Sequence, residues 1–288
     1  MFDDLTPRRS VLYMPAANER ALEKAKSIPC DAIIFDLEDA VAPDAKELAR
    51  DQAVAAVASG DYGNRQLTIR ANGIDTDWGR DDLAAIATSG ASAVVVPKVS
   101  GALHLDAVST LLDEAGAPSE LTIWPMIETP AAIFAAREIA WFDRASVLVI
   151  GTNDLARELR AELVPGRHPL IPALSTAVLA AREAGKVIID GVFNDIKDTD
   201  GFSAECRQGH EMGFDGKTLI HPSQVEPTNQ TWAPDADAIA HAQEVIDAFD
   251  AAQAQGKGVV TVGGRMIENL HVDNARRTLA VAAAIAER

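Results

Sequence analysis

The chain of 288 residues contains only two cysteines, Cys30 and Cys206. Two thiols cannot build the disulfide framework of many small secreted domains, so we expect both to be reduced and buried. No apolar stretch approaches the ~18–20 residues that are needed to cross a bilayer. The first ten residues carry early acidic side chains and no apolar core, which is unlike a signal peptide. We therefore predict a cytoplasmic protein with no membrane partner.

Basic residues are also scarce, because 26 Lys and Arg stand against 43 Asp and Glu, giving a formal net charge of −17. A field of this sign repels nucleic acid and anionic lipid, which excludes both as partners. Two catalytic motifs are missing as well. The sequence has no glycine-rich phosphate loop, since GTNDLA (151–156) lacks the required spacing, and no G-x-S-x-G nucleophile elbow.

Eight short apolar runs are present, and most of the charged residues within the motifs lie at their carboxyl ends. The runs are rich in Val, Ile and Leu and do not alternate with polar residues, which is typical of strands buried on both faces of a parallel sheet. They are SVLYMP (10–15), DAIIFDLED (31–39), QLTIRAN (66–72), SAVVVPK (92–98), LTIWPMIE (121–128), SVLVIGTND (146–154), KVIIDGVF (186–193) and GKTLIHP (216–222).

Helical segments with apolar spacings of three and four separate these runs, so each repeat has the length of a βαβ unit. The sequence therefore predicts an α/β fold, a (β/α)8 TIM barrel over residues 1–226, with its active site at the strand ends. A Pro/Asn/Thr stretch (226–234) follows. Residues 227–288 predict an extension in which a long helix, a hairpin around Gly263-Gly264 and a last helix follow one another.

Glu128 and Asp154 end the fifth and sixth runs, which are neighbouring strands of the predicted barrel. Adjacent strands lie ~4.8 Å apart, so two carboxylates there can reach one ion. Mg²⁺ prefers oxygen ligands, and neither run offers the His or Cys that a softer metal favours. The alternative is that both acids cap the helices that follow.

Arg70 ends the third run, where an arginine is costly to bury without a partner. It could clamp an anion or an enolate, or it could form a structural ion pair with Asp36 or Glu38. Glu38 could orient Arg70 or accept a proton from metal-bound water. Lys98 and His221 also end strands, but an acidic metal site disfavours a Schiff-base lysine, and His221 could equally be structural.

Asn18, Arg20 and Lys24 open the first predicted helix, and the two cations lie four residues apart on one face. On a chain this acidic, that pair suits the phosphates of a nucleotide-bearing substrate, although solvated surface charge is the alternative.

Taken in order, the motifs resemble the citrate lyase β-subunit-like family of the HpcH/HpaI aldolase superfamily. The family includes malyl-CoA, β-methylmalyl-CoA and citramalyl-CoA lyases and a malyl-CoA thioesterase, and the resemblance covers essentially the whole chain. The motifs are RRSVLYMPAANERALEKA, DAIIFDLEDAV, IRANG, VVPKV, MIET, GTNDL, DGVFND and LIHPSQ.

The resemblance implies Mg²⁺ held by Glu128 and Asp154, an enolate stabilised by Arg70, and CoA phosphates held by Arg20 and Lys24. It also implies that an acid of the extension reaches the active site of a neighbouring subunit in a homo-oligomer, a trimer or a hexamer. That acid is Glu268 here, in GRMIEN, where the family usually has Asp. A second departure is Ser100, which replaces the usual acid after VPKV.

We therefore expect a Mg²⁺-dependent carbon–carbon lyase that cleaves a malyl-, β-methylmalyl- or citramalyl-CoA thioester. The products would be acetyl- or propionyl-CoA and glyoxylate or pyruvate, with Arg70, Glu38 and Glu268 as catalytic groups. One alternative is hydrolysis of the malyl-CoA thioester in the same pocket, with Glu268 activating water. Two others are an aldolase that needs no CoA and a non-catalytic CoA-binding subunit.

Overall fold

A computed structural model describes residues 5–256 and 258–288. These residues divide into two compact units, one covering Arg8–Thr231 and one covering Trp232–Arg288 together with residues 5–7. Helix α10 (Val225–Trp232) runs across the boundary that we predicted at residue 226.

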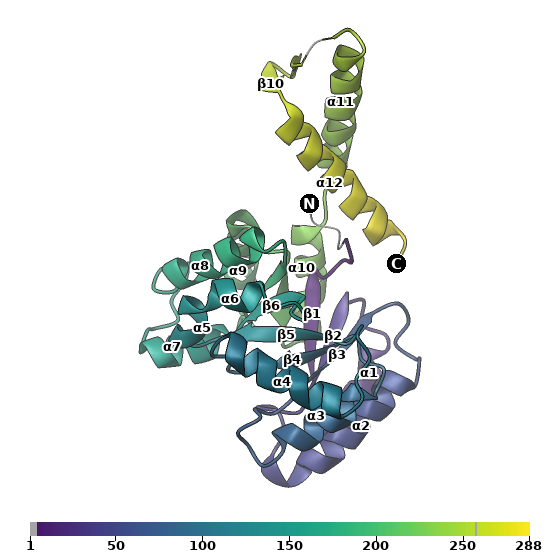
Figure 1. Cartoon of the computed structure of the whole chain (residues 1–288). Helices are drawn as coiled ribbons and strands as arrows, with labels where there is room; N and C mark the ends of the chain where they lie inside the picture. Colours follow the sequence, from purple (N-terminus) through teal and green to yellow (C-terminus); the bar gives the residue numbers. More distant parts are fainter. Residues whose placement is uncertain (1–4, 257) are drawn as a thin grey trace. The chain divides into compact units, whose positions relative to one another are not determined.

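The first unit is a closed barrel of eight parallel strands, so the predicted fold class is confirmed (Figure 1). Each strand pairs with the next along the chain, and the last pairs with the first. The strands are β1 (Ser10–Pro15), β2 (Ala32–Asp36), β3 (Gln66–Arg70), β4 (Ala93–Val96), β5 (Thr122–Ile127), β6 (Val147–Ile150), β7 (Val187–Asp190) and β8 (Gly216–Leu219).

Helices cover the outside of the barrel, as the apolar spacing predicted (Figure 1). The short helix α5 begins at Pro130, which suits a first turn, and the Thr129 hydroxyl caps it. The helices are α1 (Glu19–Ala25), α2 (Lys46–Ala58), α3 (Gly79–Ala87), α4 (Ala102–Glu114), α5 (Pro130–Phe134), α6 (Ala136–Ala140), α7 (Thr152–Leu159), α8 (Ile171–Glu183) and α9 (Thr199–Met212), with 3₁₀ turns η1 (Pro43–Ala45) and η2 (Pro222–Gln224).

Most of the Pro/Asn/Thr stretch after the last strand is helical, as α10. Pro227 lies in the first turn, where a missing N–H costs little. Thr228 Oγ1 donates to the Gln224 carbonyl over 2.6 Å, and Thr231 Oγ1 donates to the Pro227 carbonyl over 2.9 Å. The hydroxyl groups of this polar segment are therefore satisfied by carbonyls one turn earlier in the chain.

Inward-facing side chains of the strands fill the barrel and form one apolar cluster around the fully buried Trp124. All four residues of β4, β6, β7 and β8 are buried. This explains why the strands show apolar runs without alternation, and it leaves the carboxyl ends of the strands to carry polar groups.

The second unit contains the predicted long helix, hairpin and last helix, which confirms that part of the fold. Helix α11 (Ala236–Gln253) and helix α12 (Asn269–Ala286) pack together, and the strands β9 (Val260–Val262) and β10 (Arg265–Ile267) pair antiparallel. Phe249, Val262, Ile267 and Val272 form part of its own apolar core.

Candidate active site

A cavity of about 360 Å³ opens at the carboxyl ends of the barrel strands. Three of the residues that we predicted from strand ends line it together, namely Arg70, Glu128 and Asp154. Residues from β1 and β2 and the loop after β2 also contribute, among them Tyr13, Asp36 and Asp39. The structure therefore brings the predicted acids and the predicted guanidinium to one place.

Arg70 and Asp36 form a two-point ion pair, because the register of β2 and β3 places them side by side. Arg70 Nε and Nη2 each donate to one oxygen of Asp36 over 2.6 Å. Burial works against the charge of Asp36, but Arg70 and two main-chain N–H groups hold its pKa below the usual value. The Arg70 guanidinium also lies 4.9 Å from the centre of the Tyr13 ring, so its plane is held firmly.

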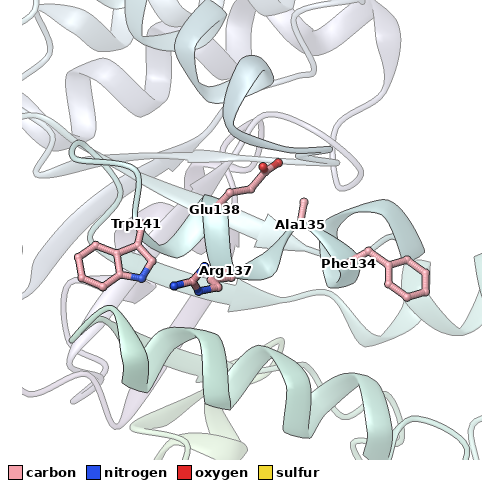
Figure 2. A pocket seen from close by; sticks show the side chains of 5 residues that line it. All are labelled: Phe134, Ala135, Arg137, Glu138 and Trp141. Atoms are coloured by element: carbon pink, nitrogen blue, oxygen red, sulfur yellow. The ribbon is translucent and has the colours of Figure 1, made fainter.

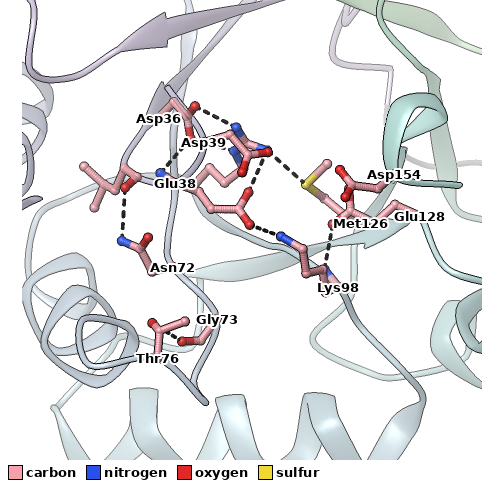
Figure 3. Close-up of polar contacts among 12 residues, drawn as sticks. Asp36, Glu38, Asp39, Asn72, Gly73, Thr76, Lys98, Met126, Glu128 and Asp154 are labelled. Atoms are coloured by element: carbon pink, nitrogen blue, oxygen red, sulfur yellow. Dashed lines mark hydrogen bonds and ion pairs between the residues drawn. The ribbon is translucent and has the colours of Figure 1, made fainter. Parts of the chain in front are cut away.

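The Glu38 carboxylate contacts both Arg70 and Lys98, and Figure 3 shows its contact with Lys98. Its Oε1 atom accepts from the Lys98 ammonium, and its Oε2 atom lies 2.9 Å from Arg70 Nη1. The second contact is an ion pair rather than a directed hydrogen bond, since Oε2 has no hydrogen-bond partner among the described residues. Burial raises the pKa of Glu38, against the opposing effect of both cations.

Glu128 is almost fully buried, with 1% of its surface exposed. Its Oε1 atom accepts the Lys98 main-chain N–H over 2.7 Å. Burial raises its pKa to about 7, and the charges of Glu38 and Asp154 add to that effect. Among the described residues, the Glu128 carboxylate has one hydrogen bond and no ion pair, so a divalent ion would compensate its charge.

Asp154 lies in the first turn of α7, and Gly151 is the N-cap of that helix. Thr129 rather than Glu128 caps the helix after β5. Capping therefore does not explain either acid. Asp154 pairs with Arg157 over 2.6 Å, but 65% of the Arg157 side chain is exposed, so solvent weakens this pair.

A buried ammonium that the sequence did not reveal supports the loop after β2. Lys46 is 5% exposed, and its Nζ atom donates to the carbonyls of Leu37 and Glu38 and to Asn72 Oδ1 over 2.7–2.8 Å. Asp82 accepts from Asn72 in turn, and Arg50 pairs with Asp82. Burial lowers the pKa of Lys46. The network fixes the backbone that presents Glu38 to Arg70 and Lys98.

A second unpredicted network lies where the end of β7 pairs with the start of β8. Asp190 is fully buried and pairs with Arg167 over 2.7 Å and with Lys217 over 3.1 Å. Lys217 also pairs with Glu205 of α9. The only sequence signal was an Asp and a Lys inside apolar runs, and nothing in the chain pattern linked them to Arg167.

The residues predicted to hold CoA lie on α1 rather than in the cavity. Asn18 Oδ1 accepts the Ala21 main-chain N–H over 3.1 Å and thereby caps the helix. Arg20 and Lys24 are exposed and have the four-residue spacing of one helical face. Their binding of CoA phosphates remains a prediction.

The other strand-end residues have structural partners. The pKa of Lys98 is raised because Glu38 outweighs its burial, which disfavours the neutral amine that a Schiff base requires. His221 caps the turn η2 by accepting from the Ser223 main-chain N–H over 3.2 Å.

Glu268 lies in the second unit at the start of α12, where its main-chain N–H donates to His271 Nδ1. Its catalytic role stays a prediction.

A different hollow lies on the outer helices α5 and α6, lined by the exposed Phe134 and Trp141 with Arg137 and Glu138 (Figure 2). It contains no residue from a strand end. Within residues 5–256 and 258–288, no three His, Cys, Asp or Glu side chains come together as a ready metal cage. The described part of the chain also has no helix that is long and apolar enough to cross a membrane.

The barrel, with buried acids and an arginine at the mouth, defines an enzyme whose active site is built from strand ends. The sequence matches the HpcH/HpaI aldolase/citrate lyase family over residues 9–222, and the chain belongs to that family. It is 49% identical over 280 residues to a (3S)-malyl-CoA thioesterase of Cereibacter sphaeroides, covering 97% of this chain and 96% of the relative. It is 34% identical over 278 residues to the citrate lyase subunit beta of Escherichia coli, covering 94% and 92%.

A solved structure gives the same assignment. The CitE protein of Mycobacterium tuberculosis, in complex with magnesium, acetoacetate and coenzyme A, superimposes with a TM-score of 0.77 at 25% identity. The match covers 97% of this chain and all of the other.

Proposed function

We propose that the protein hydrolyses the thioester of a malyl-CoA-type substrate with the help of Mg²⁺. The observation that carries this proposal is one cavity in which a buried, uncompensated acid, Glu128, lies with Asp154 and Arg70. The full-length relatives named (3S)-malyl-CoA thioesterases supply the substrate class. They favour hydrolysis, our alternative from the sequence, over the carbon–carbon cleavage that we expected first.

Glu128 and Asp154 would hold the metal, because both offer carboxylate oxygens and Glu128 has no cation of its own. When bound, Mg²⁺ supplies a positive charge that polarises substrate oxygens. The magnesium in the related CitE structure supports the choice of ion.

Arg70 stabilises the negative charge that develops on the thioester oxygen when water attacks the carbonyl carbon. Asp36 holds two of its donor atoms, Nε and Nη2, and so fixes the direction of the remaining one. Water supplies the hydroxyl group of the product acid, and the CoA thiol leaves with a proton. Glu268 of a neighbouring copy takes the proton from the water, which requires a homo-oligomer, a trimer or a hexamer.

Arg20 and Lys24 bind the phosphates of CoA outside the cavity, and Asn18 fixes the start of their helix. The coenzyme A in the related CitE structure supports an acyl-CoA substrate. Two flexible cations on an otherwise acidic chain supply the local attraction that such an anion needs.

A second candidate is carbon–carbon cleavage of the same substrate, which the relatives named citrate lyase subunit beta favour. In that reaction Arg70 stabilises the enolate of acetyl-CoA, and Glu268 provides its proton. The two reactions use the same cavity and differ in whether the carbonyl carbon or the neighbouring carbon–carbon bond reacts.

The test is incubation of the full chain with (3S)-malyl-CoA and Mg²⁺, followed by mass spectrometry of the products. We expect free malate and CoA. Glyoxylate with acetyl-CoA would instead show the lyase reaction. The matched control is Glu128→Gln, which keeps the shape of the side chain and removes its charge. Turnover that survives in this variant would refute the metal assignment, and no turnover by the wild type on any acyl-CoA would refute the enzyme class.

A further inference from the structure

Lys98 has an unusual backbone conformation at the end of β4. Its φ angle is 50°, in the left-handed region that non-glycine residues seldom occupy. This conformation accompanies two hydrogen bonds that Lys98 donates to two different glutamates (Figure 3). The main-chain N–H donates to Glu128 Oε1, and the ammonium donates to Glu38 Oε1. A strained residue with both contacts at an active-site mouth invites a functional explanation.

The donors of Arg70 show what the ammonium contributes. Asp36 accepts from Nε and from one of the two N–H groups of Nη2, so Nη1 is the guanidinium nitrogen that does not donate to Asp36 and keeps both of its N–H groups for other acceptors. Nη1 has only the weak acceptor Met126 Sδ at 3.9 Å as a hydrogen-bond partner among the contacts of the described residues. Glu38 is the nearest competitor for this nitrogen, since its Oε2 atom is within 2.9 Å of Nη1 but is not aligned with the N–H.

The balance of charges in and beside the cavity is consistent with Arg70 Nη1 being available to the substrate. Arg70 and Lys98 offset Asp36 and Glu38, which leaves Glu128 and Asp154 for a divalent cation. Asp39 lies 3.8 Å from Arg70 Nη1 and is 62% exposed at its side chain, so water screens it. Without the Lys98 ammonium, Arg70 would be the one cation among the described residues in an ion pair with the Glu38 carboxylate.

We propose that Lys98 is a positioning residue whose ammonium holds Glu38 away from alignment with Arg70, so that Arg70 Nη1 stays available to the thioester oxygen. The inference deepens the proposed function and rests on it for the identity of that oxygen. The Lys98 backbone acts separately, since its N–H orients Glu128. Lys98 itself does not touch the reacting atoms in this role.

Three variants separate the ammonium from the backbone. Lys98→Gly removes the side chain but adopts a positive φ without strain, so the N–H to Glu128 is preserved. Lys98→Arg restores a cation on the strained backbone. Arg160→Gly is the matched control, because Arg160 is an exposed cation with a φ of 54° at the end of α7.

We expect Lys98→Gly to lower kcat about 10- to 100-fold. Without the ammonium, Arg70 Nη1 would donate to Glu38 instead of stabilising the thioester oxygen in the transition state. The KM for the acyl-CoA and the Mg²⁺ concentration for half-maximal activity should change less than about threefold. Lys98→Arg should recover most of the lost kcat, and Arg160→Gly should match the wild type.

Three kinetic outcomes would overturn the inference in an active wild-type enzyme, two of them in Lys98→Gly and one in Lys98→Arg. One is a kcat of Lys98→Gly within twofold of the wild type. The other is weaker Mg²⁺ binding at unchanged kcat, which would place the effect at Glu128. Failure of Lys98→Arg to recover activity would also count against it, because a purely structural side chain would not be rescued by charge.

A crystal structure of Lys98→Gly tests the inference without any turnover. Glu38 should rotate to form a directed hydrogen bond with Arg70 Nη1. A Glu38 side chain that keeps its wild-type position would refute the role of Lys98, even if the proposed hydrolysis proves correct. Absence of wild-type turnover with a rotated Glu38 would count against the proposed function alone.

Discussion

A Cβ atom at Gly151 would lie 2.2 Å from Oε2 and 2.5 Å from Cβ of Glu128. The two positions are neighbours because β5 and β6 pair in register up to Ile127 and Ile150. Gly151 has a φ of −106°, which other residues adopt readily, so space rather than backbone conformation requires the glycine here.

Gly151→Ala should therefore displace Glu128 and lower kcat/KM by at least about 100-fold, because a shift of ~1 Å can cost that much. The metal requirement should rise in parallel, measured as the Mg²⁺ concentration for half-maximal activity. Gly258→Ala is the control, because a Cβ there meets nothing within 4 Å. Wild-type kinetics in Gly151→Ala would show that the position of Glu128 does not matter.

The raised pKa of Glu128 predicts a pH dependence of stability without metal. Its pKa is about 7 in the folded chain against an ordinary 4.5, so the folded state binds this proton more tightly. Metal-free stability should fall by up to ~3 kcal/mol as the pH rises through this window. Chemical denaturation between about pH 5 and pH 8 measures it, and Glu128→Gln should remove this component.

Mg²⁺ should reverse that trend, since the ion competes with the proton for the carboxylate. The rise in Tm on adding Mg²⁺ should therefore grow as the pH increases toward neutrality and then level off. A protective effect that is equal at acidic and neutral pH, or one that persists in Glu128→Gln, would contradict ligation by Glu128.

Arg70→Lys should keep the charge and lose the two-point contact with Asp36, because an ammonium cannot reproduce the guanidinium fork. We expect kcat to fall by ~10²–10³, with a loss of ~1–3 kcal/mol in the free energy of unfolding. Arg137→Lys is the matched control, since Arg137 makes the same kind of contact with Glu183 at an exposed site. Equal effects of the two substitutions would remove Arg70 from the chemistry.

The double substitution of Arg20 and Lys24 by Ala should raise the KM for malyl-CoA about 10- to 100-fold at unchanged kcat, through two lost charge contacts of ~1 kcal/mol each. Malyl-pantetheine, which lacks the nucleotide phosphates, should be hydrolysed equally by variant and wild type. Arg207→Ala on exposed α9 serves as the control. A KM that rises equally for both substrates would point away from phosphate binding.

Subunit complementation tests the predicted role of Glu268. Glu128→Gln and Glu268→Ala should each be inactive alone, because one lacks the metal ligand and the other lacks the base. Co-refolded mixtures should regain part of the wild-type activity if Glu268 completes the site of a neighbouring copy. Mixtures as inactive as the separate variants would show that each chain uses its own Glu268, and an active Glu268→Ala alone would show that Glu268 is not used.

The sequence indicated Arg70, Glu128 and Asp154 as partners because parallel strands present their carboxyl ends at one edge. In a barrel of βα units, consecutive strands are neighbours. Residues at the carboxyl ends of consecutive apolar runs therefore lie close together at one end of the barrel. The resemblance of the motifs to a family led to the substrate class that we propose, although it did not decide between hydrolysis and cleavage.

The sequence did not reveal Lys46 beneath the loop after β2 or the pairing of Arg167 with Asp190. Both depend on loops and helix starts whose geometry follows from packing rather than from apolar periodicity. The sequence also did not predict the contacts of Lys98 with Glu128 and Glu38. A lysine at the end of a strand gives no indication that its backbone is left-handed.

The order and spacing of the apolar runs thus determined the barrel, its extension and the end of the barrel that carries the acids, because local periodicity and chain connectivity suffice for these. Only the tertiary structure decided which carboxylates are neutralised by cations and that Glu128, in the described part of the chain, is buried without an ion-pair partner. Charge compensation acts across space between residues far apart in the chain, so it requires the packed fold.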